Sequence, residues 1–132
     1  MGLVYANLSL GNLQKPELKP IEQEALVDSG ALHLCIPQHV AMQLDLQQID
    51  TREVVVADGS RHRVPYVGPI LLKVANRQCL AGAMVLGNQI LLGAIQMEDM
   101  DLVVRPSMGD VVPNPQNPNI AVSLAMGVRH PR

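Results

Sequence analysis

One carboxylate in this chain, that of Asp28, follows a run of apolar residues and is therefore expected to lose water contacts when that run is buried. Asp28 directly follows the apolar run Ala25–Val27 and is followed by Ser29 and Gly30. An acid at the end of a buried strand costs free energy unless it reaches the surface or is hydrogen-bonded. Asp-Ser-Gly also suits an ordinary turn, in which the acid caps its own backbone. The triplet is therefore either a plain turn or a carboxylate held in place for acid–base chemistry.

A second segment repeats part of this pattern later in the chain. Residues 24–31 and 89–94 both run an apolar strand into Gly-Ala, and a segment able to form a helix follows each. The first copy has Asp-Ser before its glycine, whereas the second has Leu91 and Leu92 before Gly93. A match of this length can arise by chance, so it gains weight only beside other signals.

The strongest hairpin signal lies between these two segments. Val54–Val56 is a β-branched run, Asp58 and Gly59 are a favoured turn pair, and a second extended run follows. We expect a hairpin over residues 53–66 whose polar tip, residues 57–63, projects into solvent. The tip contains three solvated basic residues: Arg61, His62 and Arg63.

Three possible metal ligands follow the Asp-Ser-Gly triplet: His33, Cys35 and His39. A zinc site usually needs three or four ligands that converge on one point. Pro37 divides the strand that carries the first two from the helix that carries the third, so the three side chains should point apart. We therefore expect no metal and no other cofactor.

Other residues that suggest chemistry have simpler interpretations. Three acids could hold a cation, but a solvated helix face explains them better: Glu98, Asp99 and Asp101. The two cysteines lack metal-ligand spacing with each other and are expected as buried free thiols in a reducing compartment: Cys35 and Cys79. Four methionines are expected to fill the core: Met84, Met97, Met100 and Met126.

Short strands and regular turns must position these residues. An opening strand is expected over residues 3–10 and a turn-rich connector over 11–20, before the apolar runs that flank the Asp-Ser-Gly turn. Later turns are expected at 76–79 and 87–89, and a proline-rich extended loop with a final apolar run forms the tail. Many short strands with few helices make the chain mostly β, and residues 1–132 are treated as one domain.

One or two short helices are also expected. Pro37 can open the first, in which Val40 and Leu44 share an apolar stripe with Met42 or Leu46. The segment MEDMDLVV can begin as a short helical turn before the chain extends again.

Composition excludes several classes of function. The 132 residues suit one domain, 48% of them are hydrophobic, and the net charge is −2. There is no Phe or Trp, only Tyr5 and Tyr66, and no basic excess, so nucleic acid is not expected as a partner. The most apolar stretch, residues 80–94, is too short to span a bilayer, and no signal-peptide pattern is present. We expect no membrane partner and a cytoplasmic location.

Three elements together resemble the retropepsin-like aspartic proteases (clan AA), most closely the small bacterial single-domain members. The first is hydrophobic-hydrophobic-Asp-Ser/Thr-Gly-Ala, here Leu26–Ala31. The second is a flap hairpin downstream of it, here residues 53–66. The third is a hydrophobic-hydrophobic-Gly triplet before a short helix, here Leu91–Gly93. The resemblance covers about residues 20–106 of the chain.

The resemblance implies a mostly β, retropepsin-like closed β-barrel with one or two short helices, active as a two-fold homodimer. One Asp-Ser-Gly per chain supplies one catalytic carboxylate. Two copies of Asp28 would therefore meet, share a proton and activate a water that hydrolyses a peptide bond. The chain ends, residues 2–10 and 119–128, would interleave into a dimer sheet.

The resemblance also implies supporting roles for other residues. The active-site loop would be supported by Ser29, Gly30 and Ala31. The second-half core motif would consist of Leu91, Leu92 and Gly93. The flap that closes over a peptide or protein substrate would be formed by Ala57, Asp58, Gly59 and Ser60.

Two positions depart from the retroviral pattern. An acidic residue and an arginine that pair with each other in those enzymes are replaced here by Leu32 and Ala94. The replacement affects the expected substrate-backbone contacts and dimer bracing, but not the carboxylate pair. Two alternatives stay open: a catalytically idle homodimer of the same fold that binds peptides or serves as a scaffold, and a non-protease β-barrel in which Asp28 only caps a turn.

Overall fold

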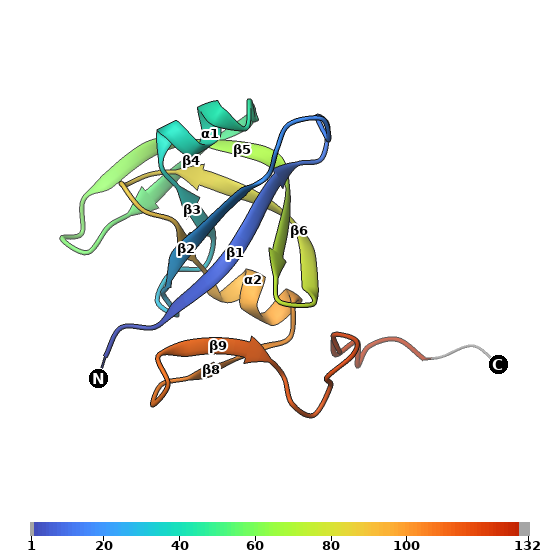
Figure 1. The fold of residues 1–132 in the computed structure, drawn as a ribbon. Helices are drawn as coiled ribbons and strands as arrows, with labels where there is room; N and C mark the ends of the chain where they lie inside the picture. The colour runs from blue at the N-terminus through green and yellow to red at the C-terminus, as the bar shows by residue number, and fades with distance from the viewer. Residues whose placement is uncertain (1, 130–132) are drawn as a thin grey trace.

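Strands are the main regular element of the structure (Figure 1), a computed structural model that describes residues 2–129. The elements, in chain order, are β1 (Tyr5–Asn12), β2 (Ile21–Val27), β3 (Leu34–Ile36), α1 (Gln38–Gln43), β4 (Gln47–Val55), β5 (Arg61–Val74), β6 (Arg77–Val85), β7 (Leu91–Leu92), α2 (Ala94–Asp99), β8 (Leu102–Arg105) and β9 (Asp110–Pro113). Within the described residues, no helix has the length and apolar character needed to cross a lipid bilayer.

Six strands close into a barrel. Their order is β1-β2-β7-β3-β6-β5, and the ring closes because β1 also pairs with β5. β4 pairs with β5 outside this ring, so the β4–β5 hairpin extends away from the barrel wall (Figure 1). β8 and β9 form a separate two-stranded sheet, drawn below the barrel in that view. The expected fold class is thus confirmed as mostly β, with a closed barrel and two short helices.

The barrel interior is built from aliphatic side chains. In β1, Leu8 and Leu10 are buried and alternate with more exposed neighbours, as a strand with one inward face requires. A fully buried Leu or Ile contributes about 2 kcal/mol relative to an exposed one. Val40 in α1 and Leu44 at its C-terminal end join this core, and the half-buried Leu46 packs against it. The expected apolar stripe of the first helix is therefore confirmed for these three residues.

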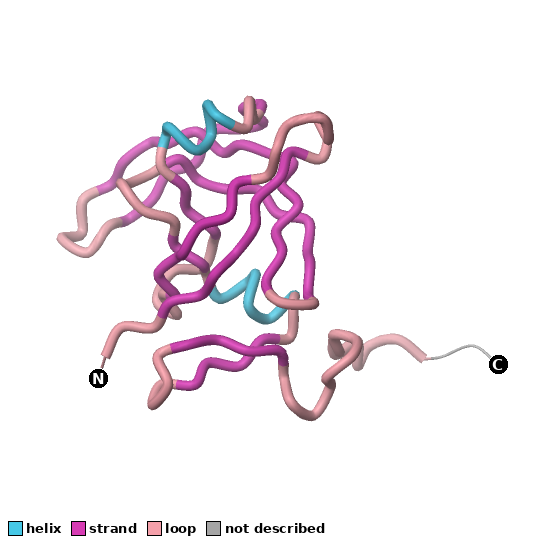
Figure 2. Tube along the Cα trace, in the orientation of Figure 1, coloured by secondary structure: helices cyan, strands magenta, loops and turns pink. Residues whose placement is uncertain are grey.

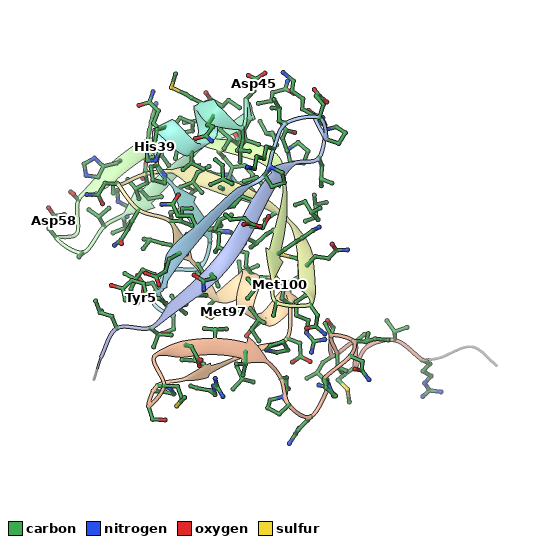
Figure 3. All side chains as sticks on the ribbon, in the orientation of Figure 1. Tyr5, His39, Asp45, Asp58, Met97 and Met100 are labelled. Carbon is green, nitrogen blue, oxygen red and sulfur yellow. The ribbon has the colours of Figure 1, made fainter. Side chains whose placement is uncertain are left out.

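The methionines divide between the core and the surface. Met97 in α2 and Met100 just after it are buried (Figure 3), and Met84 is half-buried. Met126 is 87% exposed, so the expectation that it fills the core is wrong. Met42 is 70% exposed because it lies on the face of α1 opposite the buried stripe. The spacing of apolar residues along the sequence did not show that Met42 and Met126 face outward.

The hairpin expected over residues 53–66 is present and longer than expected. Its first strand, β4, begins at Gln47 and pairs with β5 up to Val55. The turn occupies residues 56–60, so the tip is shorter than the expected 57–63. The three basic residues at the start of β5 are exposed, as expected: Arg61, His62 and Arg63.

The next turns lie close to their expected places. The turn expected at 76–79 occupies Ala75 and Asn76, and Arg77 already begins β6. Ala75 has a φ of 51°, in the left-handed region that lets the chain reverse within two residues. The bend at residues 87–89 is where the sequence indicated it.

Asp101 ties the C-terminal tail to the end of α2. Its carboxylate accepts hydrogen bonds from Asn114 Nδ2 (3.1 Å), Asn117 Nδ2 (2.8 Å) and the Val122 N–H (3.1 Å). The buried Arg77 guanidinium lies 4.0 Å from the same carboxylate. The expectation of a solvated acid is therefore wrong for Asp101. The other two acids of the segment are exposed, as expected: Glu98 and Asp99.

The N-terminal segment forms part of the barrel, whereas the C-terminal tail contains no strand after β9 within the described residues. Tyr5–Leu10 pairs with β2, and Ser9–Asn12 also pairs with β5, so the N-terminal segment is first of all a barrel strand. Residues 2–4 and 119–128 contain no strand, and the tail is drawn as loop in Figure 2. An interleaved dimer sheet made from these ends stays a prediction.

The hydrogen bonds at Asp101 predict an acid-dependent anchor for the tail. The Val122 amide, followed by the two asparagine side chains, lowers the pKa of Asp101 below its usual 3.8. A lowered folded-state pKa means that this contribution to stability is present above pH 3.8 and is lost as the pH falls through the lower folded value. In an NMR titration, the Val122 amide signal should therefore shift below pH 3.8, and Asp101→Asn should abolish that shift.

Asp110→Asn is the matched control for this titration. Asp110 is also paired, with Arg105 at 2.6 Å, but it does not contact Val122. The Val122 shift should survive this change. A Val122 signal that titrates equally in the Asp101→Asn variant would show that Asp101 is not the anchor.

Candidate active site

Asp28 lies at the first position after β2, in a tight loop. Its N–H donates to the Leu92 carbonyl at 3.1 Å, and its own carbonyl accepts from the Ala31 N–H at 3.1 Å. Asp28 Oδ1 accepts from the Gly30 N–H at 2.9 Å, while Ser29 and Gly30 are exposed. The half-buried carboxylate is thus held by its own loop at the surface of the barrel. This geometry fits both a positioned catalytic acid and an aspartate that caps a turn.

The structure brings together the two segments that resemble each other in sequence. β2 and β7 run parallel, with Leu26 opposite Leu91 and Val27 opposite Leu92. The sequence places a loop directly after each strand, so parallel pairing puts the Asp28 loop and Gly93 at the same end of the barrel. The short sequence match therefore corresponds to a real contact.

Gly93 allows this contact to be close. A Cβ at this position would lie 2.6 Å from the Leu32 carbonyl oxygen and 2.7 Å from the His33 carbonyl oxygen. Its φ of −92° is open to any residue, so the need for glycine is steric. Beyond it, the N–H groups of Ala94 and Ile95 donate to the carbonyls of Ala31 (2.9 Å) and Leu32 (3.1 Å). The start of α2 is thereby bonded to the Asp28 loop.

The positions that depart from the retroviral pattern lie at this same junction. Ala94 is half-buried and joins the loop through its backbone, so no side-chain ion pair is formed there. Leu32 is 63% exposed, and Ile95, whose N–H bonds to it, is 44% exposed. Two apolar side chains therefore stand at the surface beside the Asp28 loop.

Cys35 is a neighbour of Asp28 that the sequence did not single out for this role. It is buried on β3, opposite Leu91 of β7, and its thiol donates to the His33 carbonyl at 3.7 Å. Burial raises the pKa of the Cys35 thiol, and the negative charge of Asp28 raises it further. Cys35 and Asp28 come near each other because only the short strand β7 lies between β2, which leads to Asp28, and β3, which carries Cys35.

The hairpin tip forms a compact polar turn. Val56 N–H donates to the Ser60 carbonyl at 3.0 Å, and Gly59, with a φ of 84°, completes the turn. Asp58 Oδ1 accepts from the Ser60 N–H (2.8 Å) and hydroxyl (2.6 Å), which together hold the pKa of Asp58 below 3.8. The remaining tip residue, Ala57, is exposed. Figure 3 labels Asp58 at the outer end of the hairpin.

The hairpin tip is not joined to the Asp28 loop within one chain. In the described part of the chain, the hydrogen bonds of residues 56–60 stay within the β4–β5 hairpin. The structure thus unites the first and third elements of the expected site, and leaves the second, the flap, apart from them.

Tyr66, near the base of the β4–β5 hairpin, packs on Gly82 of β6, and the sequence did not reveal this pair. A Cβ on Gly82 would overlap the Tyr66 ring at 2.1 Å from its hydroxyl oxygen, so the ring lies directly on the glycine. The Arg52 guanidinium of β4 stacks on the Tyr66 ring, 4.1 Å from its centroid. The available signal was that Tyr66 is one of only two tyrosines in a chain without Phe or Trp.

The metal-ligand candidates do not converge. His39 is exposed on α1 (Figure 3), whereas Cys35 is buried on β3. Among residues 2–129, no three His, Cys, Asp or Glu side chains are grouped closely enough to hold a metal ion.

Three hollows on the described surface are lined by residues other than Asp28 itself. One of about 790 Å³ is lined by the beginning of β2, including Glu22 and Glu24, whereas Asp28 follows the end of that strand. Another of about 390 Å³ lies between α1 and the hairpin base, lined by Ala41 and Val64 among others. A third of about 600 Å³ lies between α2 and the tail.

No protein-family model and no curated protein matches this chain.

Gly93→Ala should destabilise the protein by about 1–3 kcal/mol, the usual range for forcing a methyl group into a packed site. The added Cβ would meet two backbone carbonyls, which cannot move without shifting the Asp28 loop. Chemical denaturation would measure the loss. Gly127→Ala is the control, because a Cβ there meets nothing within 4 Å and should change stability by less than about 0.5 kcal/mol. Equal effects at the two positions would contradict the steric account.

Asp28→Asn should lower the pKa of the Cys35 thiol. The change removes a negative charge that disfavours the thiolate, while asparagine can still accept the Gly30 N–H. Titration of the cysteine Cβ carbon signal by NMR, in a Cys79→Ser background, would measure it. Asp58→Asn, at the hairpin tip, should leave the Cys35 value unchanged. An unchanged Cys35 pKa in Asp28→Asn would mean that the carboxylate does not act on this thiol.

Proposed function

We propose that this chain is an aspartic endopeptidase that acts as a retropepsin-like homodimer. The observation that carries the proposal is the junction of the Asp28 loop with the β7–α2 segment. Asp28 follows β2 where that strand runs parallel to β7, and α2 begins with hydrogen bonds to the same loop. Two sequence motifs that are distant in the chain thus hold one carboxylate in a fixed position at the surface.

The carboxylate is presented so that a second copy could approach it. Oδ1 is occupied by the Gly30 N–H at 2.9 Å. Among the described residues, no group donates a hydrogen bond to the other carboxylate oxygen, Asp28 Oδ2. That oxygen is available to a water molecule or to the matching carboxylate of another copy.

The chemistry follows from placing two such carboxylates together. Two carboxyl groups in contact do not both ionise, so in the proposed dimer they share one proton and titrate as a pair. The ionised carboxylate takes a proton from a water molecule, whose oxygen attacks the carbonyl carbon of the peptide. The protonated carboxyl donates its proton to the carbonyl oxygen as negative charge develops there. As the tetrahedral intermediate collapses and its carbon–nitrogen bond breaks, the carboxyl that received the water proton passes it to the leaving amine. A hydroxyl of the intermediate returns its proton to the other carboxylate, so the pair again shares one proton.

Exposed apolar side chains beside the loop support a contact with a second copy. Leu32 and Ile95 both stand at the surface next to Asp28 and are linked through their backbones. Apolar groups gathered next to a functional loop commonly mark an interaction surface. In the proposed dimer, this surface would be covered when the two Asp28 loops meet.

The β4–β5 hairpin is proposed to act as the flap. It extends from the barrel and carries an exposed tip at Ala57–Gly59. Closing such a hairpin over a bound peptide would exclude water from the carboxylate pair.

A catalytically idle dimer that binds peptides is the second candidate. The absence of a side-chain ion pair between Leu32 and Ala94 favours it, since a brace found in retroviral enzymes is missing at these positions. The Gly30 N–H bond to Asp28 Oδ1 is also the bond that an ordinary turn-capping aspartate makes. The idle dimer and a β-barrel in which Asp28 only caps a turn both predict a folded chain in which Asp28 does no chemistry.

Asp28→Asn should abolish cleavage of a peptide library. General acid–base catalysis contributes about 10²–10⁴-fold, so the rate should fall by at least about 100-fold. Digests would be read by mass spectrometry across about pH 4 to 7, the range suggested by a carboxyl pair that shares a proton. Asp110→Asn is the matched control, because it removes a carboxylate of β9, outside the Asp28 loop and the proposed flap, and should reduce cleavage far less. Cleavage that persists in Asp28→Asn would overturn the proposal, and no cleavage by a folded wild-type dimer would favour the idle module.

A further inference from the structure

α1 lies beside the base of the β4–β5 hairpin (Figure 1), and a pocket of about 390 Å³ separates the two. Pockets that bind small molecules usually measure about 300–1,000 Å³. The apolar part of its lining comes from α1, from the segment that leads into β4, from β5 and from the end of β6: Ala41, Leu46, Val64, Pro65, Val67 and Val85. We refer to it as the hairpin pocket.

The apolar lining of the hairpin pocket belongs to the edge of the barrel core. Ala41 and Val67 are buried members of that core, and the half-buried Leu46 and Val85 pack against it. The apolar surface is therefore held in place by packing. Among the described residues, no aromatic side chain lines the pocket, so it offers no face on which a flat ring could stack. An aliphatic chain suits this lining better than a ring does.

One cation lines the hairpin pocket without a counter-charge. Among the described residues, Arg63 forms no ion pair. Glu53 lies opposite Arg63 in the β4–β5 pairing, but it binds Arg61 instead, at 3.0 Å. The third guanidinium of the hairpin, that of Arg52, pairs with Asp50 at 3.0 Å. The other polar side chains that line the pocket are uncharged: Gln38 and Gln48.

The side chain of Gln48 is already engaged within its own strand. Its Nε2 donates to the Asp50 carbonyl at 3.3 Å and to Thr51 Oγ1 at 3.2 Å. Arg63 is therefore the one uncommitted charge beside an apolar surface. A ligand that complements both features carries one negative charge at the end of an aliphatic body.

We propose that the hairpin pocket binds a small aliphatic monocarboxylate. The hydrocarbon chain would lie on the apolar lining, and the carboxylate would accept two parallel hydrogen bonds from the Arg63 guanidinium. One carboxylate balances one guanidinium, whereas a phosphate dianion would leave a charge unpaired. No residue of the Asp28 loop lines this pocket, so the proposal is independent of the proposed endopeptidase activity.

An NMR titration with octanoate tests the site without any assay of catalysis. The methyl signals of Ala41 in α1 and Val64 in β5 should shift together and saturate, because the ligand would contact both walls of the pocket. Octan-1-ol, which has the same chain length and no charge, should bind at least about 10-fold more weakly, because it cannot form the charged hydrogen bonds to Arg63.

Arg63→Gln should lower the affinity for octanoate by at least about 10-fold and change the affinity for octan-1-ol by less than about 2-fold. Arg63 is exposed, so this change should leave the fold intact. Arg105→Gln is the matched control, because it removes a guanidinium of β8 that does not line the pocket. It should change the affinity for octanoate by less than about 2-fold. Equal effects of the two substitutions would overturn the proposal.

A series of chain lengths tests the apolar part of the site. From butanoate to octanoate, each added methylene should tighten binding by up to about 4-fold, the effect of burying one such group. Equal affinities for acetate and octanoate would mean that Arg63 holds an adventitious ion only, and would overturn the proposal. Shifts confined to the exposed Leu124 and Met126 would place the hydrocarbon on the tail and would also reject the hairpin pocket.

Discussion

The parallel contact between β2 and β7 is the feature on which the rest of the candidate site depends. It places the residue after Val27 beside the residue after Leu92, and the absence of a side chain at Gly93 lets the two backbones meet. The Asp28 loop then needs no side-chain brace, because the first N–H groups of α2 already bond to it. The same helix leads directly to Asp101, so the tail is oriented by the element that supports the carboxylate.

Much of this arrangement could be read from the sequence, where local rules and distant contacts agree. An acid after an apolar strand, a glycine after a second apolar strand and an Asp-Gly turn between them were each visible as local signals. Their common meaning depended on the order in which the segments occur. The closed barrel follows from many short aliphatic strands, since a small β protein with only two aromatic residues can bury its side chains by closing the sheet on itself.

The contacts that could not be read from the sequence are those made by single residues across long distances. Asp101 looked like one more acid on a solvated helix, yet its left-handed φ of 52° turns the chain so that three donors from the tail reach it. Cys35 looked like an inert thiol, and only the position of β7 between β2 and β3 brings it near Asp28. Met126 is apolar, as core residues usually are, but it lies in a segment that the barrel does not cover. Spacing along the chain carries no information about which of these partners will be present.

The stacking of Arg52 on Tyr66 gives the hairpin an optical property. The chain has no tryptophan and only two tyrosines, so its ultraviolet fluorescence comes from Tyr5, in β1, and Tyr66, at the hairpin base. A guanidinium 4.1 Å from the ring and a glycine beneath it make the surroundings of Tyr66 sensitive to small displacements of β4 against β6. The molecule therefore contains its own spectroscopic reporter of hairpin position, and a tryptophan in an added peptide would be the sole indole signal in the sample.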